Sequence, residues 1–196
     1  MSLASICCFK TCFEGTGFTI KGTSTREITP IILDNRHMGH DVVILKNGFR
    51  ICGNGGAICT APLVQSKSYF EVKIQQGGKW SIGLATRKTD FNSSGGKDSE
   101  SWVLTSGGTL QHNGTIVHSN LDIPTEGNIV GVSYDHIDLN FYVNGKALEK
   151  PLTAIKGTVY PALFVDDGAV LDLIIDNFQG TMPSGFERIL IEQSLL

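Results

Sequence analysis

The sequence predicts an all-β protein, because short segments with strand periodicity alternate with turn signals and no amphipathic helix is visible. Leu139, Phe141 and Val143 alternate with polar residues, which is the pattern of a half-buried strand. The pair Asn144-Gly145 follows and suits a type I′ turn, because both central residues of that turn need positive φ. The 23 glycines are typical of a chain with many tight turns.

We expect a two-sheet antiparallel β-sandwich, since the buried segments are spaced less evenly than the strands of an up-and-down barrel. In chain order, strands are expected at residues 31–33, 42–45, 50–52, 57–60, 68–74, 80–85, 102–104, 109–111, near 116, 129–134, 139–143, 159–165 and 170–175. Residues 186–191 are expected to form a last strand or a short helix. The segments 68–74 and 80–85 both alternate and are joined by a Gly-rich turn, which predicts that they pair as antiparallel neighbours.

Three polar segments are expected to form the most exposed loops. Residues 34–41 follow the first strand, residues 87–101 are the longest polar stretch, and Asp135-His136 separates two strands. Shorter loops or turns are expected at residues 46–49, 53–56 and 166–168.

The composition indicates one folded domain, because 196 residues are enough for one substantial core and few for two. We place this domain at residues 23–196, after a cysteine-containing tail at residues 1–22. The net charge of −3 provides no basic surface, so we expect no binding to nucleic acid. No apolar run is long enough to span a bilayer and the N-terminus lacks a signal-peptide pattern, so we expect a cytoplasmic monomer.

The tail carries three of the five cysteines, namely Cys7, Cys8 and Cys12. An odd cysteine count without a secretion signal argues against a disulfide framework. Thioester-linked acyl chains on these cysteines would hold the protein at a membrane, because two chains suffice for stable attachment. A zinc site is a second reading, although the tail offers no evident fourth ligand. The third is a tail with unmodified thiols.

A cysteine hydrolase is one alternative, with Cys52 or Cys59 as the nucleophile. The candidate bases are His37, His40 and His136. Neither cysteine lies at a predicted helix N-terminus, which would lower its pKa, and a buried cysteine is usually a small hydrophobic residue. We therefore expect no catalytic residue.

Metal binding is also weighed, either through His37, His40 and Asp41 or through a calcium site of a lectin-like, carbohydrate-binding sandwich. The acidic residues available for the calcium site are Asp34, Asp135, Asp166 and Asp167. Their positions are typical of turn residues whose carboxylates bond the local backbone. We expect neither a metal nor a cofactor.

Two blocks of the sequence resemble the SPRY family. The first joins an aromatic-Phe-Glu-Val strand at 69–72 to Trp80, Ile82-Gly83-Leu84-Ala85 through a Gly-rich turn. The second contains Glu126-Gly127-Asn128-Ile129-Val130-Gly131, then Tyr134-Asp135, then Leu139, Phe141-Tyr142-Val143-Asn144-Gly145. Tyr160-Pro161-Ala162 and Pro183-Ser184-Gly185-Phe186 follow in the same order as in the family.

This resemblance implies a bent, concanavalin-like β-sandwich that recognises a peptide or protein through loops at one end, without a cofactor or catalysis. The loops combine arginine and aromatic residues, which are frequent interface anchors. The candidate partner-binding residues are Arg36, His37, Met38, Arg87, Phe91, Trp102, Asp135 and His136.

Overall fold

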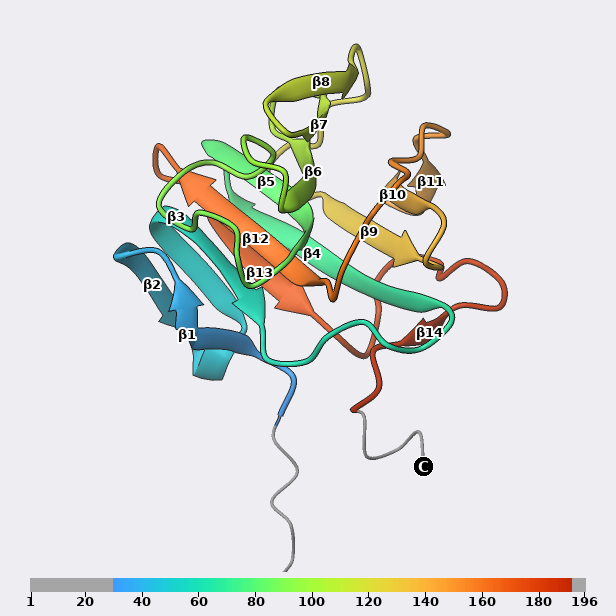
Figure 1. Cartoon of the computed structure of the whole chain (residues 1–196), viewed down its shortest axis with the longest axis horizontal. Helices are drawn as coiled ribbons and strands as arrows, with labels where there is room; N and C mark the ends of the chain where they lie inside the picture. Colours follow the sequence, from blue (N-terminus) through green and yellow to red (C-terminus); the bar gives the residue numbers. More distant parts are fainter. Residues whose placement is uncertain (1–29, 192–196) are drawn as a thin grey trace, which may run out of the picture.

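The computed structural model describes residues 30–191, which form two curved, mainly antiparallel sheets packed face to face (Figure 1). Sheet A contains β1 (Leu33–Met38), β3 (Arg50–Cys59), β12 (Tyr160–Asp166), β5 (Lys79–Ala85), β6 (Ser101–Thr105), β7 (Leu110–His112) and β8 (Thr115–His118). Sheet B contains β2 (Asp41–Leu45), the first part of β3, β13 (Val170–Ile174), β4 (Ser68–Gln76), β9 (Ile129–Tyr134), β10 (Leu139–Val143) and β11 (Lys146–Ala147). A 3₁₀ turn, η1 (Lys46–Gly48), joins β2 to β3, and the short β14 (Glu187–Arg188) runs parallel to β4. The predicted all-β sandwich is confirmed.

The hairpin after β10 forms as the sequence predicted. Asn144 and Gly145 have φ values of 47° and 83°, so both central residues of the turn lie in the left-handed region. The turn pairs Val143 with Lys146 at the edge of sheet B. The bounds of β9 and β10 are those expected from the sequence.

The prediction of a loop at residues 53–56 is wrong, because β3 continues through these residues. Ile51 pairs with β13 in sheet B, whereas residues 55–58 pair with β12 in sheet A. Gly53 and Gly55 have φ values of 99° and 123°, and these conformations bend the strand from one sheet into the other. The glycines therefore allow one strand to serve both sheets.

The predicted pairing of residues 68–74 with residues 80–85 is also wrong. These segments are β4 and β5, but β4 pairs with β9 and β13, while β5 pairs with β6 and β12. The turn at Gln76–Gly78 carries the chain from sheet B across to sheet A. Alternation shows which face of a strand is buried, but it does not choose the neighbouring strand.

Two predictions at the start of the domain need correction. The polar residues 34–37 belong to β1 and form a bulge in it, since Leu33 is opposite Cys59 and Met38 is opposite Ala57. Residues 42–45 were expected to be buried, but only one face of β2 meets the core, so that Val42 is 4% exposed and Val43 is 49% exposed.

The main core fills the space between the sheets. Phe70, Val72 and Ile74 from β4 face Ile82 and Leu84 from β5 within this one cluster. A second, smaller cluster covers the outer face of sheet A and consists of Ile58, Ala85, Val103, Tyr160, Ala162 and Phe164. The long loop at residues 86–100 folds back onto this cluster through Phe91, so it lies against the sheet rather than extending into solvent.

Candidate functional site

A cleft with a volume of about 620 Å³ lies on the outer face of sheet A. It is at the end of the sheet where β5 begins and where β6 and β12 end. The residues that line it are Asn54, Gly55, Lys79, Trp80, Ser81, Asn92, Ser93, Ser94, Gly95, Lys97, Thr105, Ser106, Gly107, Gln111, Phe164, Val165 and Asp166. Most are small or polar, and Gly55, Gly95 and Gly107 expose their backbone to the cleft.

One wall of the cleft is the long loop, which the carboxylate of Asp98 holds in shape. Asp98 Oδ2 accepts hydrogen bonds from Thr89 Oγ1 at 2.7 Å and from Asp90 N at 2.8 Å. Its Oδ1 accepts bonds from Glu100 N at 3.0 Å and from Ser101 Oγ at 2.8 Å. Partial burial opposes ionisation, but these four donors outweigh it and lower the pKa of Asp98. The loop is thus a preformed wall.

Close contact between this loop and the sheet depends on a glycine. A Cβ at Gly95 would lie 2.6 Å from the ring of Phe164, which is closer than real Cβ atoms approach another atom. The backbone of the loop is also joined to β3, because Gly56 N donates a 2.8 Å hydrogen bond to Phe91 O. Phe164 is 1% exposed and forms an apolar part of the lining beneath the loop.

The charged groups of the cleft are two lysines and one aspartate. Lys79 Nζ lies 3.6 Å from Asp167 Oδ2, and both of these side chains are largely exposed. Within residues 30–191, Lys97 forms no ion pair with a carboxylate. The cleft can therefore offer a lysine ammonium group to a bound molecule.

The structure separates the eight predicted partner-binding residues into two groups. Arg36, His37 and Met38 are in β1, and the first two belong to its bulge. His37 Nδ1 lies 2.7 Å from Asp34 Oδ2, and Arg36 N donates a 2.9 Å bond to Asp34 Oδ1. Partial burial opposes ionisation of Asp34, yet the bonds from Arg36 and His37 lower its pKa.

Phe91 lies beside this first group, because the backbone that follows β1 contacts the backbone at Phe91. A Cβ at Gly39 would lie 2.4 Å from Phe91 O, and His40 N donates a 2.9 Å hydrogen bond to Asn92 Oδ1. Because Asn92 lines the cleft, the segment after β1 supports its rim.

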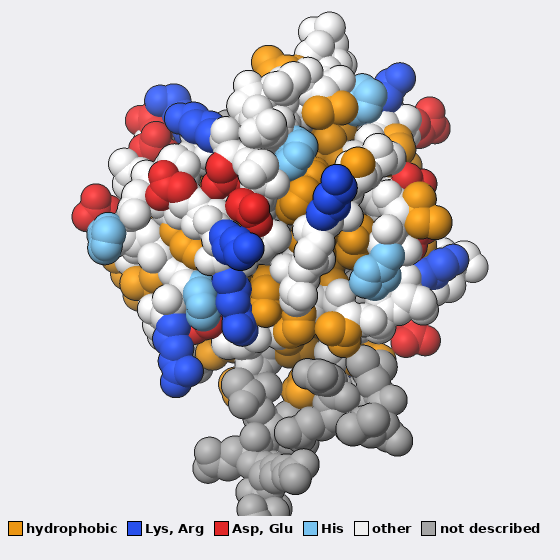
Figure 2. All heavy atoms as spheres, in the orientation of Figure 1, with side chains coloured by type: hydrophobic (Ala, Val, Ile, Leu, Met, Phe, Trp, Pro, Cys, Tyr) orange, Lys and Arg blue, Asp and Glu red, His pale blue; other side chains and the backbone are white. Residues whose placement is uncertain are grey.

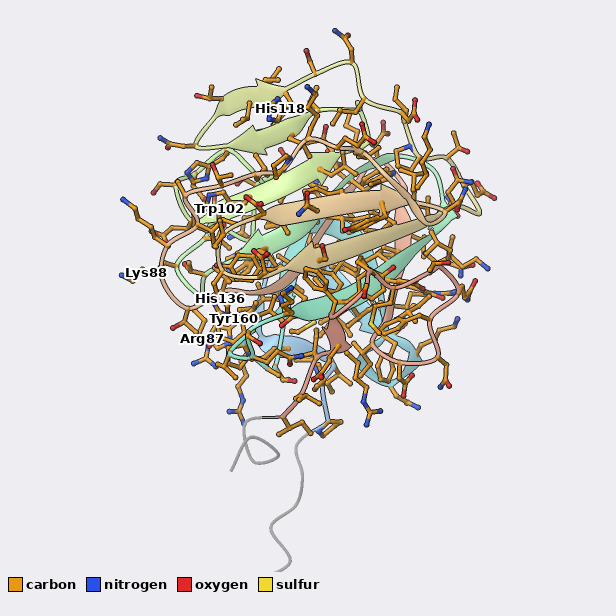
Figure 3. All side chains as sticks on the ribbon, turned by 90° about the vertical axis from the view of Figure 1, so that its right-hand side faces the viewer. Arg87, Lys88, Trp102, His118, His136 and Tyr160 are labelled. Carbon is orange, nitrogen blue, oxygen red and sulfur yellow. The ribbon has the colours of Figure 1, made fainter. Side chains whose placement is uncertain are left out.

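The second group is at the other end of the sandwich. The pairing of β5 and β12 sets Ala85 opposite Tyr160 at one end and Lys79 opposite Asp166 at the other. Figure 3 shows Arg87, Trp102, His136 and Tyr160 on the same side of the molecule. The guanidinium of Arg87 lies 4.9 Å from the centroid of the Tyr160 ring, a cation–π contact.

Trp102 is 3% exposed, so little of its side chain can touch a partner directly. Its ring stacks on His112 with the centroids 4.6 Å apart and an interplanar angle of 8°. His112 Nδ1 is 2.9 Å from Ser101 O, which fixes the orientation of the imidazole. The indole Nε1 is buried and has no hydrogen-bond partner within residues 30–191.

Asp135 and His136 form a rigid turn between β9 and β10. Asp135 Oδ1 accepts bonds from Ile137 N at 3.1 Å and Asp138 N at 2.8 Å. His136 has a φ of 67°, and its Nε2 lies 2.9 Å from Gln65 O. The turn is therefore joined to the loop between β3 and β4.

Sequence reasoning missed most residues that line the cleft. Residues 79–81, 105–107 and 164–166 are in strands or short turns, and only the packing of the sheets brings them together. The one local signal was the Gly- and Ser-rich composition at 92–96 and 106–108, which allows the backbone to be approached closely.

The thiols and carboxylates considered above as catalytic or metal-binding groups lack the neighbouring residues that those roles require in the described part of the chain. Burial raises the pKa of Cys59, and Cys52 Sγ lies 3.8 Å from Val43 O. In the described part of the chain neither thiol has a histidine as hydrogen-bond partner, and no cluster of three His, Cys, Asp or Glu residues is suited to a metal. Among these same residues no helix is long and apolar enough to cross a membrane. Cys7, Cys8, Cys12 and the boundary between residues 22 and 23 lie outside the described residues.

Comparison with known proteins decides the family. A model of the SPRY domain matches residues 67–178. The chain is 46% identical over 200 residues to SPRY domain-containing protein 7 of Homo sapiens, with complete coverage of both chains, and 45% identical to its counterpart in Gallus gallus. The chain belongs to the SPRY family. SPRY domains are known as protein-interaction modules and are generally non-enzymatic.

Solved structures agree at the level of the fold. The SPRY domain of human HERC1 has a TM-score of 0.61 at 18% identity, covering 75% of this chain and 99% of that one. The PSpry domain of TRIM65 has a TM-score of 0.60 at 15% identity, covering 74% of this chain and 92% of that one. At these identities the likeness concerns the SPRY sandwich alone.

Proposed function

We propose that this SPRY protein is a non-catalytic recognition module that binds an extended peptide segment of a protein partner in the cleft of sheet A. The observation that carries the proposal is the cleft itself, with its preformed loop wall and its small polar lining residues. Small side chains leave backbone N–H and C=O groups within reach of a peptide backbone, and buried Phe164 adds an apolar contact.

Carbohydrate recognition is the competing function. Lectin sites commonly present an exposed aromatic ring to a sugar face, but the aromatic residues of this cleft, Trp80 and Phe164, are 3% and 1% exposed. Carboxylates considered for calcium already interact with other groups of the protein. Asp135 accepts a hydrogen bond from Asp138 N, and Asp167 forms an ion pair with Lys79. These features favour a peptide over a sugar.

A cleft-filling substitution tests the proposal. A Cβ at Gly107 meets only Thr105 Oγ1, at 3.7 Å, so we expect Gly107→Trp to leave the fold intact and to occupy part of the cleft. Gly77→Trp is the matched control, because a Cβ at Gly77 has no atom within 4 Å and the residue is outside the cleft. Peptides selected on the wild-type protein should bind Gly77→Trp normally and Gly107→Trp about tenfold more weakly in titration calorimetry. Equal affinity for both variants would refute the cleft as the peptide site.

We further propose that the protein is a cytoplasmic monomer that acyl chains on Cys7, Cys8 and Cys12 tether to membranes. The support is the position of these three cysteines close together near the first residue. Hydroxylamine cleaves thioesters, so treatment should move the protein from the membrane fraction of a cell extract to the soluble fraction. An unchanged distribution would exclude the tether.

A further inference from the structure

The end of the sandwich opposite the cleft carries a group of exposed side chains that the proposed function does not use. We define the Arg87 face as Val64, Arg87, Lys88, His136 and Ile137. We propose that this face is a second interaction surface, which binds an acidic segment of a protein partner independently of the cleft. Figure 3 shows Arg87, Lys88 and His136 on one side of the molecule, next to Tyr160.

The apolar part of the Arg87 face is unusually exposed and rigidly held. Ile137 is 70% exposed and Val64 is 42% exposed. Their loops are joined, because His136 Nε2 lies 2.9 Å from the carbonyl oxygen of Gln65. Asp135 Oδ1 caps the turn by accepting bonds from the N–H groups of residues 137 and 138. A rigid turn loses little entropy on binding, so an apolar side chain at its tip is well placed as an anchor.

The polar part of the face consists of donors that lack acceptors. Arg87 rests on Tyr160, and within residues 30–191 neither Arg87 nor Lys88 forms an ion pair. The carboxylate of Glu100 bonds to Thr86, because its Oε2 accepts a bond from Thr86 Oγ1, and it forms no ion pair with Arg87. The Tyr160 ring therefore holds the guanidinium in place without neutralising it, which favours a carboxylate from another molecule.

Trp102 does not belong to the Arg87 face, because its side chain packs in the main core whereas Tyr160 lies in the cluster on the outer face of sheet A. Trp102 is only 3% exposed, and its buried indole Nε1 has no hydrogen-bond partner in the described part of the chain. Arg87 and Lys88 are both charged donors, so the chemistry that they share is recognition of an anion.

A protein segment that combines an apolar residue with aspartate or glutamate fits both parts of the face. Figure 2 shows one side of the molecule, on which hydrophobic side chains are exposed between charged ones. A second copy of the chain fits less well, because a two-fold contact through this face would put four unpaired cations, Arg87 and Lys88 of each copy, into one interface. The protein as a whole carries a net charge of −3, so exposed cations without an ion pair, such as Arg87 and Lys88, are not a general property of its surface.

Random peptides displayed on phage and selected on the Gly107→Trp protein test the proposal, since part of the cleft is then occupied. The selected peptides should be rich in Asp and Glu beside an apolar residue. Their affinity for the full chain, measured by titration calorimetry, should fall about tenfold in Ile137→Ser and at least as much in Arg87→Glu. It should also fall as salt is raised, because charge attraction is screened. Gly77→Trp should bind normally.

Several results would overturn the proposal. They are a selection that yields no peptides, peptides without acidic residues, and affinities that neither substitution changes. A dimer detected by sedimentation equilibrium and dissociated by Ile137→Ser would also overturn the proposal, because the face would then bind a second copy of the chain. Binding to phosphatidylserine vesicles, but not to acidic peptides, would identify a membrane as the ligand. Ile137 and Arg87 are exposed, so thermal unfolding should be the same in all variants.

Discussion

Gly56 shows how one residue on β3 controls the outer face of sheet A. A Cβ at this position would lie 2.1 Å from Phe164 Cδ1 and 2.4 Å from Cε1. The φ of Gly56 is outside the left-handed region, so the backbone would accept any residue and only the ring excludes a side chain. Because Phe164 lines the cleft, a side chain at position 56 would displace part of the proposed peptide site.

Gly56→Ala is therefore expected to destabilise the protein by about 1–3 kcal/mol, the usual cost of overpacking a core. The measurement is the free energy of unfolding from urea titration. Gly77→Ala is the control, since its Cβ would have no neighbour within 4 Å, and its effect should be below about 0.5 kcal/mol. Equal stabilities of the two variants would show that the Phe164 ring yields easily.

At the scale of elements, Glu71 in β4 fastens the segment that follows β13. Its carboxylate is fully buried and accepts hydrogen bonds from Tyr69 Oη at 2.9 Å and from the N–H groups of Gln179 and Gly180 at 2.8 Å. Phe178 packs edge-on against Tyr69, with the ring centroids 4.9 Å apart. Burial and the bond to Glu71 raise the pKa of Tyr69, so its hydroxyl remains a donor.

Glu71→Gln should loosen this segment, because the amide nitrogen that replaces one carboxylate oxygen cannot accept a bond from a backbone N–H, although the remaining oxygen still can. We expect faster hydrogen exchange at the amides of Gln179 and Gly180 and a loss of about 1–3 kcal/mol in stability. The control is Lys73→Gln on the same face of β4, which should leave both amides protected. Unchanged exchange in Glu71→Gln would show that Phe178 alone holds the segment.

At the scale of the whole molecule, three partly buried aspartates connect distant parts of the chain. Asp98 holds the long loop, and Asp34 bonds to the bulge of β1. Asp172 in β13 accepts bonds from Arg50, Lys46 Nζ and Gln75 Nε2, which come from three other elements. Burial opposes ionisation of Asp172, but Arg50 and Lys46 outweigh it, so its pKa is lowered like those of the other two.

These lowered values predict acid-dependent stability. A carboxyl group whose pKa is lower in the folded state stabilises the protein above its unfolded pKa of about 3.9, and this contribution is lost as pH falls through the folded pKa. The urea midpoint should therefore change little between about pH 7 and pH 5 and fall steeply below about pH 4. In Asp98→Asn the fall should be shallower. A midpoint that is constant down to about pH 2.5 would contradict the assignment.

The sequence by itself determined the fold class and most strands. Alternating residues in β4, β9 and β10 report which face is buried, and the Asn144-Gly145 pair requires positive φ, so both signals are local. The order of the two family blocks identified the SPRY sandwich. The long loop at 87–101 was also predictable, because it lacks apolar periodicity over many residues.

The tertiary structure alone decided which strands pair and where the cleft lies. The turn at Gln76–Gly78 is short enough for a hairpin, and only contacts with the distant strands β9 and β12 place β4 and β5 in different sheets. The candidate residues Arg36 and Arg87 were grouped by chemistry, but Arg36 lies in the bulge of β1 beside β3, whereas Arg87 follows β5 and rests on Tyr160 of β12. Local patterns specify conformation and burial, whereas a site assembled from remote strands depends on long-range packing that those patterns do not encode.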